Sequence, residues 1–139
     1  VLVGDRMLGK PADAAEAAAM LRTLSGRFHT VLTGVAVLDA GSGRVERGLE
    51  RTLVKVADLD ELTIEAYVRT GEPMDKAGAY AVQGLGSLFI ERIEGCYFNV
   101  VGLPLALLGR LLARFGFTVV RGWPVACAGE PGRARGQGN

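Results

Sequence analysis

Two long β-type segments separated by a glycine-rich turn dominate the middle of this chain and limit the folds open to it. Residues 28–38 are mostly apolar and β-branched, and residues 44–57 alternate charged and apolar side chains in stretches such as Leu53-Val54-Lys55-Val56. The five residues between them, Asp39-Ala40-Gly41-Ser42-Gly43, have the composition of a turn. The simplest account is a pair of antiparallel strands with one buried and one hydrated face.

Three helical segments flank this hairpin in the sequence, one before it and two after it. We expect them to begin at Asp13, Asp60 and Pro104 and to end near Ser25, Gly71 and Gly116. Apolar spacing predicts the buried sides of the second and third helices as Leu62, Ile64, Ala66 and Tyr67, and as Leu105, Leu108, Leu111 and Leu112. Shorter strands are expected at residues 1–3, 7–11, 79–82 and 88–93.

The composition fits one ordinary globular domain. The chain has 139 residues, of which 49% are hydrophobic and 22% charged, so it is long enough to bury a single core. We expect residues 1–118 to form that domain and the glycine-, proline- and arginine-rich residues 119–139 to be a disordered tail. Arg133 and Arg135 in this tail suit contact with a polyanion, but a solubilising tail is the simpler interpretation.

Charge and cysteine content exclude several classes of partner. The formal net charge of +1 provides no basic field for nucleic acid or a membrane surface, and no apolar run approaches the roughly 20 residues of a membrane helix. Cys96 and Cys127 lie far apart in sequence, which suggests neither a disulfide framework nor a metal cluster. We therefore expect a cytoplasmic protein that binds neither nucleic acid nor membrane.

The residues best suited to chemistry lie between Thr70 and Val101. Asp75 and Lys76 are adjacent and are followed by small residues, and Gln83 stands just before a Gly-Leu-Gly turn that lets a ligand approach the backbone. A surface turn with a hydrated ion pair explains the same residue types. Likewise, Lys10 after the opening hairpin suits either a surface charge or a contact with phosphate.

His29 is the only histidine in the chain. A histidine metal site or a hydrolase triad would rest on this residue alone, and such chemistry needs partners in defined roles. We therefore assign it no catalytic function.

Four segments together resemble the Maf family of nucleoside triphosphate pyrophosphatases. They are LGKP at 8–11, MLRTLSGRFHTVLTGVAV at 20–37, EAYVRTGEPMDKAGAYAVQGLG at 65–86 and IERIEGCYFNVVGLPL at 90–105. Several long motifs in the same order form a far more specific signal than a single glycine pattern. The resemblance implies an α/β fold related to the inosine triphosphate pyrophosphatases, with a mixed sheet, flanking helices and a cleft between two lobes.

The resemblance also implies an activity. Members hydrolyse a nucleoside triphosphate to the monophosphate and pyrophosphate with a divalent metal, usually Mg²⁺ or Mn²⁺, and are commonly homodimers. Lys10 matches the lysine of the family's Gly-Lys-Pro motif, Asp75 and Lys76 match its Asp-Lys-Ala-Gly motif, and Gln83 matches the position associated with base choice. Glutamine there resembles the subgroup that acts on dTTP and UTP. Cys96 departs from the family's usual acidic residue, which puts a supporting contact in doubt.

The amino end departs further from the family pattern. The family's catalytic aspartate lies in an Ala-Asp-Thr segment just upstream of the strand whose end is seen here at Val1. Neither that segment nor the preceding serine- and arginine-containing phosphate loop is present. We therefore expect this chain to be the carboxyl-terminal portion of such an enzyme, lacking the first strands and helix. The alternatives are a non-catalytic nucleotide-binding regulator of the septum-formation type and an inactive fragment.

Overall fold

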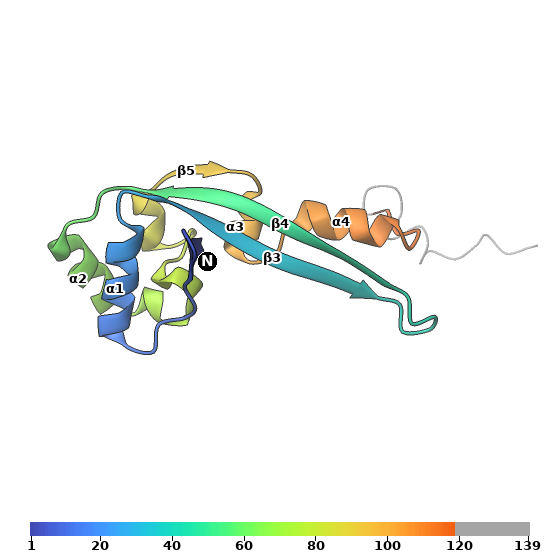
Figure 1. Cartoon of the computed structure of the whole chain (residues 1–139), viewed down its shortest axis with the longest axis horizontal. Helices are drawn as coiled ribbons and strands as arrows, with labels where there is room; N and C mark the ends of the chain where they lie inside the picture. The colour runs from blue at the N-terminus through green and yellow to red at the C-terminus, as the bar shows by residue number, and fades with distance from the viewer. Residues whose placement is uncertain (119–139) are drawn as a thin grey trace, which may run out of the picture.

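The computed structural model describes residues 1–118, and the expectations for the tail, including Cys127, Arg133 and Arg135, lie outside these residues. The described residues form an α/β structure, as predicted (Figure 1). Its elements are β1 (Leu2–Val3), β2 (Arg6–Met7), α1 (Ala14–Leu24), β3 (Phe28–Leu38), β4 (Val45–Val56), α2 (Glu61–Arg69), the 3₁₀ helices η1 (Glu72–Asp75), η2 (Ala77–Ala79) and η3 (Leu85–Phe89), β5 (Ile90–Glu94), α3 (Tyr97–Val101) and α4 (Leu105–Ala113).

A long hairpin organises the molecule, which confirms the central prediction from the sequence. β3 and β4 pair antiparallel from Phe28 opposite Lys55 to Leu38 opposite Val45 without a break. The turn closes because Asp39 accepts hydrogen bonds from the amides of Gly41 and Gly43, at 3.0 Å to its carboxylate and 2.8 Å to its carbonyl oxygen. In Figure 1 this hairpin extends well beyond the cluster of helices around its other end, and α4 runs alongside it.

The described sheet has the strand order β2-β1-β3-β4-β5, and each neighbouring pair is antiparallel. A mixed sheet also contains parallel neighbours, and residues 1–118 form none. Two of the four neighbouring pairs, β1–β2 and β3–β4, are consecutive strands joined directly by a turn, which makes them antiparallel, whereas parallel pairing needs a crossover connection. No helix within these residues combines the length and apolar character needed to cross a membrane.

The helix starts follow the capping signals in the sequence. Asp13 accepts a hydrogen bond from the amide of Glu16 at 2.8 Å, and the Glu16 carboxylate accepts one from the amide of Ala12 at 2.7 Å. Asp60 caps α2 in the same way through the amide of Thr63, at 2.8 Å. These bonds satisfy amide groups that have no partner within a helix, which explains why both helices begin where predicted.

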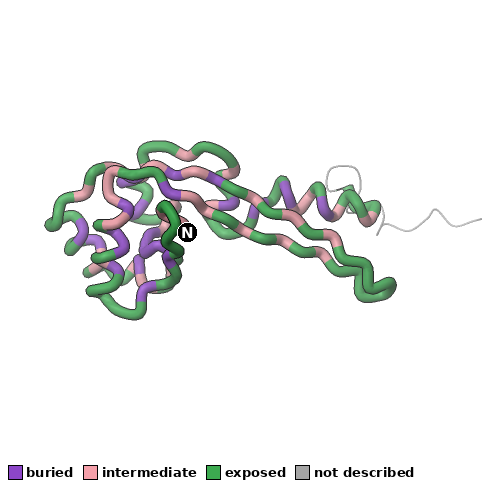
Figure 2. Tube along the Cα trace, in the orientation of Figure 1, coloured by how far each residue is buried: buried purple, intermediate pink, exposed green. Residues whose placement is uncertain are grey.

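The hydrophobic core lies at one end of the molecule, where α1 and α2 pack beside the 3₁₀ helices and the near end of the hairpin (Figure 2). Its largest buried members include Leu21, Leu24, Ile64 and Tyr67. The far end of the hairpin is mostly exposed in the same view. The packed part of the fold is therefore the end with α1, α2 and the 3₁₀ helices, while the hairpin tip lies outside the core.

Four local predictions are wrong. The strand expected at residues 7–11 is only β2, Arg6–Met7, and residues 8–11 form no strand. Residues 79–82 form no strand, because Gly78 and Ala79 both adopt left-handed backbone angles, with φ of 76° and 60°, and turn the chain. In α2, Leu62 is 77% exposed and Ala66 is exposed, so Ile64 and Tyr67 alone form the buried side. In α4 the buried side is Leu107 and Leu111, because the helix faces the hairpin with that edge.

Candidate functional site

Two segments far apart in the sequence meet at the start of η2. The amide of Gly78 donates a hydrogen bond of 2.9 Å to the carbonyl oxygen of Gly9. Lys10 follows Gly9 directly and is exposed, while the next residue, Pro11, is buried and fixes the chain at that point. The predicted phosphate-side lysine is therefore held beside the Asp-Lys-Ala-Gly segment by a backbone contact.

Asp75 and Lys76 form an ion pair at this junction. The Lys76 Nζ lies 2.7 Å from Asp75 Oδ1, and both side chains are substantially exposed. The pair is placed by the end of η1 at Asp75 and by an extended backbone at Lys76, where φ is −112°. The hydrogen bond from Lys76 holds the pKa of Asp75 below its usual value, and the positive charge of Lys10 acts in the same direction. The three predicted residues thus share one electrostatic environment.

A pocket of about 250 Å³ opens beside this pair. One wall comes from the middle of β3, a second from residues 75–80 and a third from the end of α3. Asp75 and Lys76 line it, whereas Lys10 and Gln83 are not among its lining residues. Gln83 is exposed and makes no hydrogen bond with other described residues. The structure therefore brings together Lys10, Asp75 and Lys76, and leaves Gln83 outside this pocket.

A buried polar network that the sequence analysis missed supports the back of the pocket. Asn99, which is only 1% exposed, lines the pocket and donates through Nδ2 to the carbonyl oxygen of Val31 at 3.1 Å and to Thr52 Oγ1 at 3.0 Å. Because a carbonyl oxygen only accepts, the first bond fixes the orientation of the amide. Its Oδ1 has no hydrogen-bond partner among the described residues. The only signal in the sequence is one amide side chain beside the apolar Val100 and Val101.

Cys96 takes part in this network through its backbone. Its amide donates to Thr52 Oγ1 and its carbonyl oxygen accepts from the same hydroxyl, each at 3.2 Å. The thiol is free and partly exposed. The contacts of Cys96 with Thr52 are therefore made by its backbone and not by its thiol.

His29 and Tyr80 form a second buried pair near the pocket. His29 Nε2 lies 2.8 Å from the Tyr80 hydroxyl, and the two rings meet edge to face. Burial lowers the pKa of His29 to about 4, so the imidazole is neutral near pH 7. His29 Nδ1 has no hydrogen-bond partner among the described residues. His29 is thus a buried residue that pairs with Tyr80.

The described residues do not form a metal site by themselves. No group of three histidine, cysteine, aspartate or glutamate side chains within residues 1–118 is close enough to hold an ion. Of the described residues that line the pocket, Asp75 supplies the only carboxylate, and Lys76 already neutralises it. A divalent cation bound by the protein needs more oxygen ligands than this.

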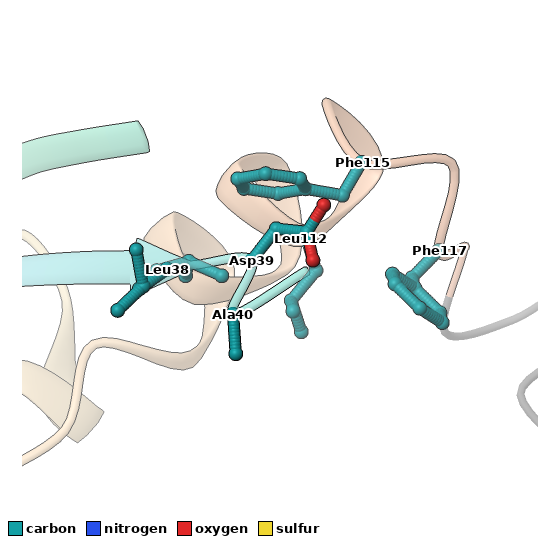
Figure 3. Close-up of a pocket in the computed structure, with 7 residues that line it drawn as sticks. Leu38, Asp39, Ala40, Leu112, Phe115 and Phe117 are labelled. Atoms are coloured by element: carbon teal, nitrogen blue, oxygen red, sulfur yellow. The ribbon is translucent and has the colours of Figure 1, made fainter. Parts of the chain in front are cut away.

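A larger hollow of about 460 Å³ lies at the hairpin tip, between the turn after β3 and the end of α4 (Figure 3). Its walls are mostly apolar and include Leu38, Leu112 and Phe115. Its carboxylate, Asp39, is already used to close the turn. None of the four candidate site residues, Lys10, Asp75, Lys76 and Gln83, lines this hollow, so it is not the candidate nucleotide site.

Comparison with known proteins agrees with the motifs. A family model described as "Maf-like protein" matches residues 1–115. Three similar relatives, each named dTTP/UTP pyrophosphatase, come from Pelotomaculum thermopropionicum, Acetivibrio thermocellus and Methanosarcina barkeri. They are 58%, 53% and 50% identical to this chain over 120, 121 and 119 residues, which is 86%, 87% and 86% of it.

The matched regions cover 63%, 60% and 60% of these relatives, so the chain spans about three fifths of their length. The family match, however, takes in every segment that forms the pocket and its supporting network. The chain therefore belongs to the Maf family.

Proposed function

We propose that this protein hydrolyses dTTP and UTP to the monophosphate and pyrophosphate, and that it removes excess or modified pyrimidine nucleotides in the cytoplasm. The observation that carries the proposal is the convergence of Lys10, Asp75 and Lys76 beside one pocket. The names of the relatives support the choice of substrate. A homodimer remains part of the proposal.

Hydrolysis of a nucleoside triphosphate depends more on correctly placed charges than on a reactive side chain. In phosphoryl transfer, negative charge spreads over the phosphate oxygens, and fixed cations stabilise it. Lys76 is suited to this role because its ammonium group is held by Asp75 at the pocket edge, and Lys10 adds a second positive charge from the neighbouring segment. Asp75 also offers an acceptor that orients Lys76 or a water molecule.

A divalent cation, Mg²⁺ or Mn²⁺, is the proposed cofactor. Mg²⁺ is usually held by one or two carboxylates together with substrate phosphates. The proposal therefore predicts that metal affinity depends on bound nucleotide, since residues 1–118 offer no cluster of ligands.

Gln83 is the proposed reader of the base. Its amide offers both a donor and an acceptor, which matches the alternating donor and acceptor groups on the edge of thymine or uracil. Where the bound base excludes water from this amide, a base that leaves the amide unpaired is rejected at a cost of about 1–3 kcal/mol. Its exposed position leaves the side chain accessible to a ligand.

The test uses two proteins. One is this chain, and the other is a chimera that adds the part of the Pelotomaculum thermopropionicum relative outside the matched region. Each is incubated with dTTP, UTP or GTP and Mg²⁺, and monophosphate and pyrophosphate are measured. We expect pyrimidine nucleotides to be hydrolysed in preference to GTP. Absence of turnover in both proteins would overturn the proposal.

A further inference from the structure

The short loop that carries Gln83 is fixed on both sides by side chains from preceding elements. Before Gln83, the amide of Ala81 donates a hydrogen bond of 3.0 Å to the hydroxyl of Tyr67 in α2. After Gln83, the amides of Leu85 and Gly86 donate to the two carboxylate oxygens of Glu72, at 3.0 and 2.9 Å. The loop that carries Gln83 is therefore held by two anchors, defined as the side chains of Tyr67 and Glu72, which both lie outside the loop.

The Glu72 anchor is a charged one. Leu85 and Gly86 begin η3, and the first amides of a helix have no partner within it. A carboxylate is well suited to bind these amides because they carry the positive end of the local dipole. Although burial acts to raise it, the pKa of Glu72 is held below its usual value by hydrogen bonds from Tyr67, Gly86 and Leu85. Glu72 is thus ionised and bound to the loop near neutral pH.

The loop is shaped to receive this carboxylate. A Cβ atom at Gly84 would overlap Glu72 Oε1, and one at Gly86 would collide with the carbonyl oxygen of Ala81. The other anchor is equally confined, because Tyr67 is 4% exposed and its ring meets that of Phe89 edge to face at 4.7 Å between centroids. The glycines of the Gly-Leu-Gly turn therefore make room for internal anchors in this structure.

Glu72 also connects the loop to the pocket. It is the first residue of η1, and Asp75, which lines the pocket, is the last. One turn of 3₁₀ helix thus joins the anchor of the Gln83 loop to the ion pair proposed to contact phosphate. We infer that Glu72 is a positioning residue, which fixes the Gln83 loop relative to the Asp75–Lys76 pair and so sets base preference. This inference rests on the base-reading role proposed above for Gln83.

The experiment compares Glu72→Gln with Glu91→Gln, which makes the same change at an exposed carboxylate in β5. Glutamine keeps the shape of Glu72 but places an NH₂ group against one of the two backbone amides and removes the charge. Backbone amide exchange is first measured on this chain by NMR. In Glu72→Gln we expect Leu85 and Gly86 to exchange at least about tenfold faster, with Glu91→Gln unchanged.

The second measurement is nucleotide preference in whichever protein turns over nucleotide. Glu72→Gln should lower the dTTP-to-GTP ratio of kcat/KM by about tenfold, chiefly through KM for dTTP, as a Gln83→Ala variant should. Gly84→Ala should also release the Gln83 loop from Glu72. Its methyl group displaces the Glu72 carboxylate but leaves the charge of that residue unchanged.

The outcomes separate the inference from the proposed function. Unchanged amide exchange in both Glu72→Gln and Gly84→Ala would overturn the inference. So would a loosened loop with unchanged preference, provided that Gln83→Ala does change it, and the proposed function would then stand. If Gln83→Ala also leaves the preference unchanged, both the base-reading role and the inference fail. If neither protein turns over nucleotide, the proposed function fails and the exchange rates alone decide whether Glu72 holds the loop.

Discussion

The amide of Gly78 donates a 2.9 Å hydrogen bond to the carbonyl oxygen of Gly9, across 69 positions of sequence. This bond places the residue after Gly9, Lys10, beside the residue two before Gly78, Lys76. Two of the three lysines of the chain thus lie beside the same segment, and the charges of both lower the pKa of Asp75. The candidate phosphate site is thus a product of tertiary contact between two glycine-containing motifs.

The first prediction concerns these two lysines. Lys10→Ala and Lys76→Ala should each weaken binding of a non-hydrolysable dTTP analogue by about tenfold or more, because a hydrogen bond to a charged group contributes about 1.5–3 kcal/mol. Isothermal titration calorimetry measures the affinity. Arg92→Ala is the matched control, since Arg92 pairs with Glu94 in β5 and does not line the pocket. An equal loss in the control would show that the effect is only one of overall charge.

The second prediction concerns Gly78 itself. Its φ of 76° is left-handed, and a Cβ atom would lie 3.2 Å from the side chain of Val1. Gly78→Ala should therefore cost the backbone penalty of about 1–2 kcal/mol and a further penalty for crowding. Gly4→Ala is the control, because Gly4 has a φ of 56° and a Cβ atom there would meet nothing within 4 Å. Urea unfolding should find Gly78→Ala the less stable variant, and equal stabilities would contradict the crowding argument.

The parts of the structure that could be predicted from the sequence are those determined by residues close together in the chain. The hairpin of β3 and β4 follows from alternation and a turn composition, and the starts of α1 and α2 follow from Asp13 and Asp60. Residues 77–89 could not be predicted, because their conformation depends on distant partners. Ala81 bonds to the Tyr67 hydroxyl, and Leu85 bonds to Glu72, so the apolar run that suggested a strand is held in turns.

The same distinction applies to the site. Asp75 and Lys76 are adjacent in sequence, so their ion pair could be predicted. The place of Lys10 near them was implied by its family motif. Asn99 and Thr52 are 47 positions apart, and only packing of α3 against β4 brings them within 3.0 Å. A polar residue between apolar ones does not reveal its partner, because hydrogen bonds between distant segments leave no periodic pattern.

The third prediction concerns base choice. Gln83→Glu replaces an amide that both donates and accepts with a carboxylate that only accepts, so one group on the pyrimidine edge loses its partner. We expect the dTTP-to-GTP ratio of kcat/KM to fall by about tenfold or more, with a smaller change in kcat for the best substrate. Steady-state kinetics with each nucleotide measures both. An unchanged ratio would count against the assignment of Gln83.

The fourth prediction concerns the buried network behind the pocket. Thr52 is fully buried and its hydroxyl serves the amide and carbonyl groups of Cys96 as well as Asn99 Nδ2. Thr52→Val keeps the shape but leaves these groups without that partner, at an expected cost of about 2–3 kcal/mol. Thr30→Val makes the same change in β3 at a side chain with no hydrogen bond to another described residue, and should cost less than about 0.5 kcal/mol. Denaturant unfolding measures the loss of stability in each variant. Equal losses in Thr52→Val and Thr30→Val would contradict the role of the Thr52 hydroxyl in the network.

The last prediction concerns pH and stability. Burial, and secondarily the charge of the amino terminus, lower the pKa of His29 to about 4, whereas an exposed histidine in the unfolded chain titrates near 6.5. Between these values the unfolded chain binds more protons than the folded one, so stability falls as pH falls. The linkage predicts that the free energy of unfolding at about pH 5 is lower than at about pH 7 by about 2 kcal/mol.

Because His29 is the only histidine, one substitution tests this assignment. His29→Gln cannot gain a proton in this range and should reduce the pH dependence, even though losing the bond to Tyr80 lowers stability at both pH values. Urea unfolding at the two pH values measures the difference for each protein. A parallel fall in both proteins would assign the dependence to carboxylates such as Asp60 and Asp75, whose lowered pKa values make them lose stabilising interactions at more acidic pH. A steeper fall in the protein with His29 than in His29→Gln would instead establish the buried imidazole as the group that destabilises the fold on mild acidification.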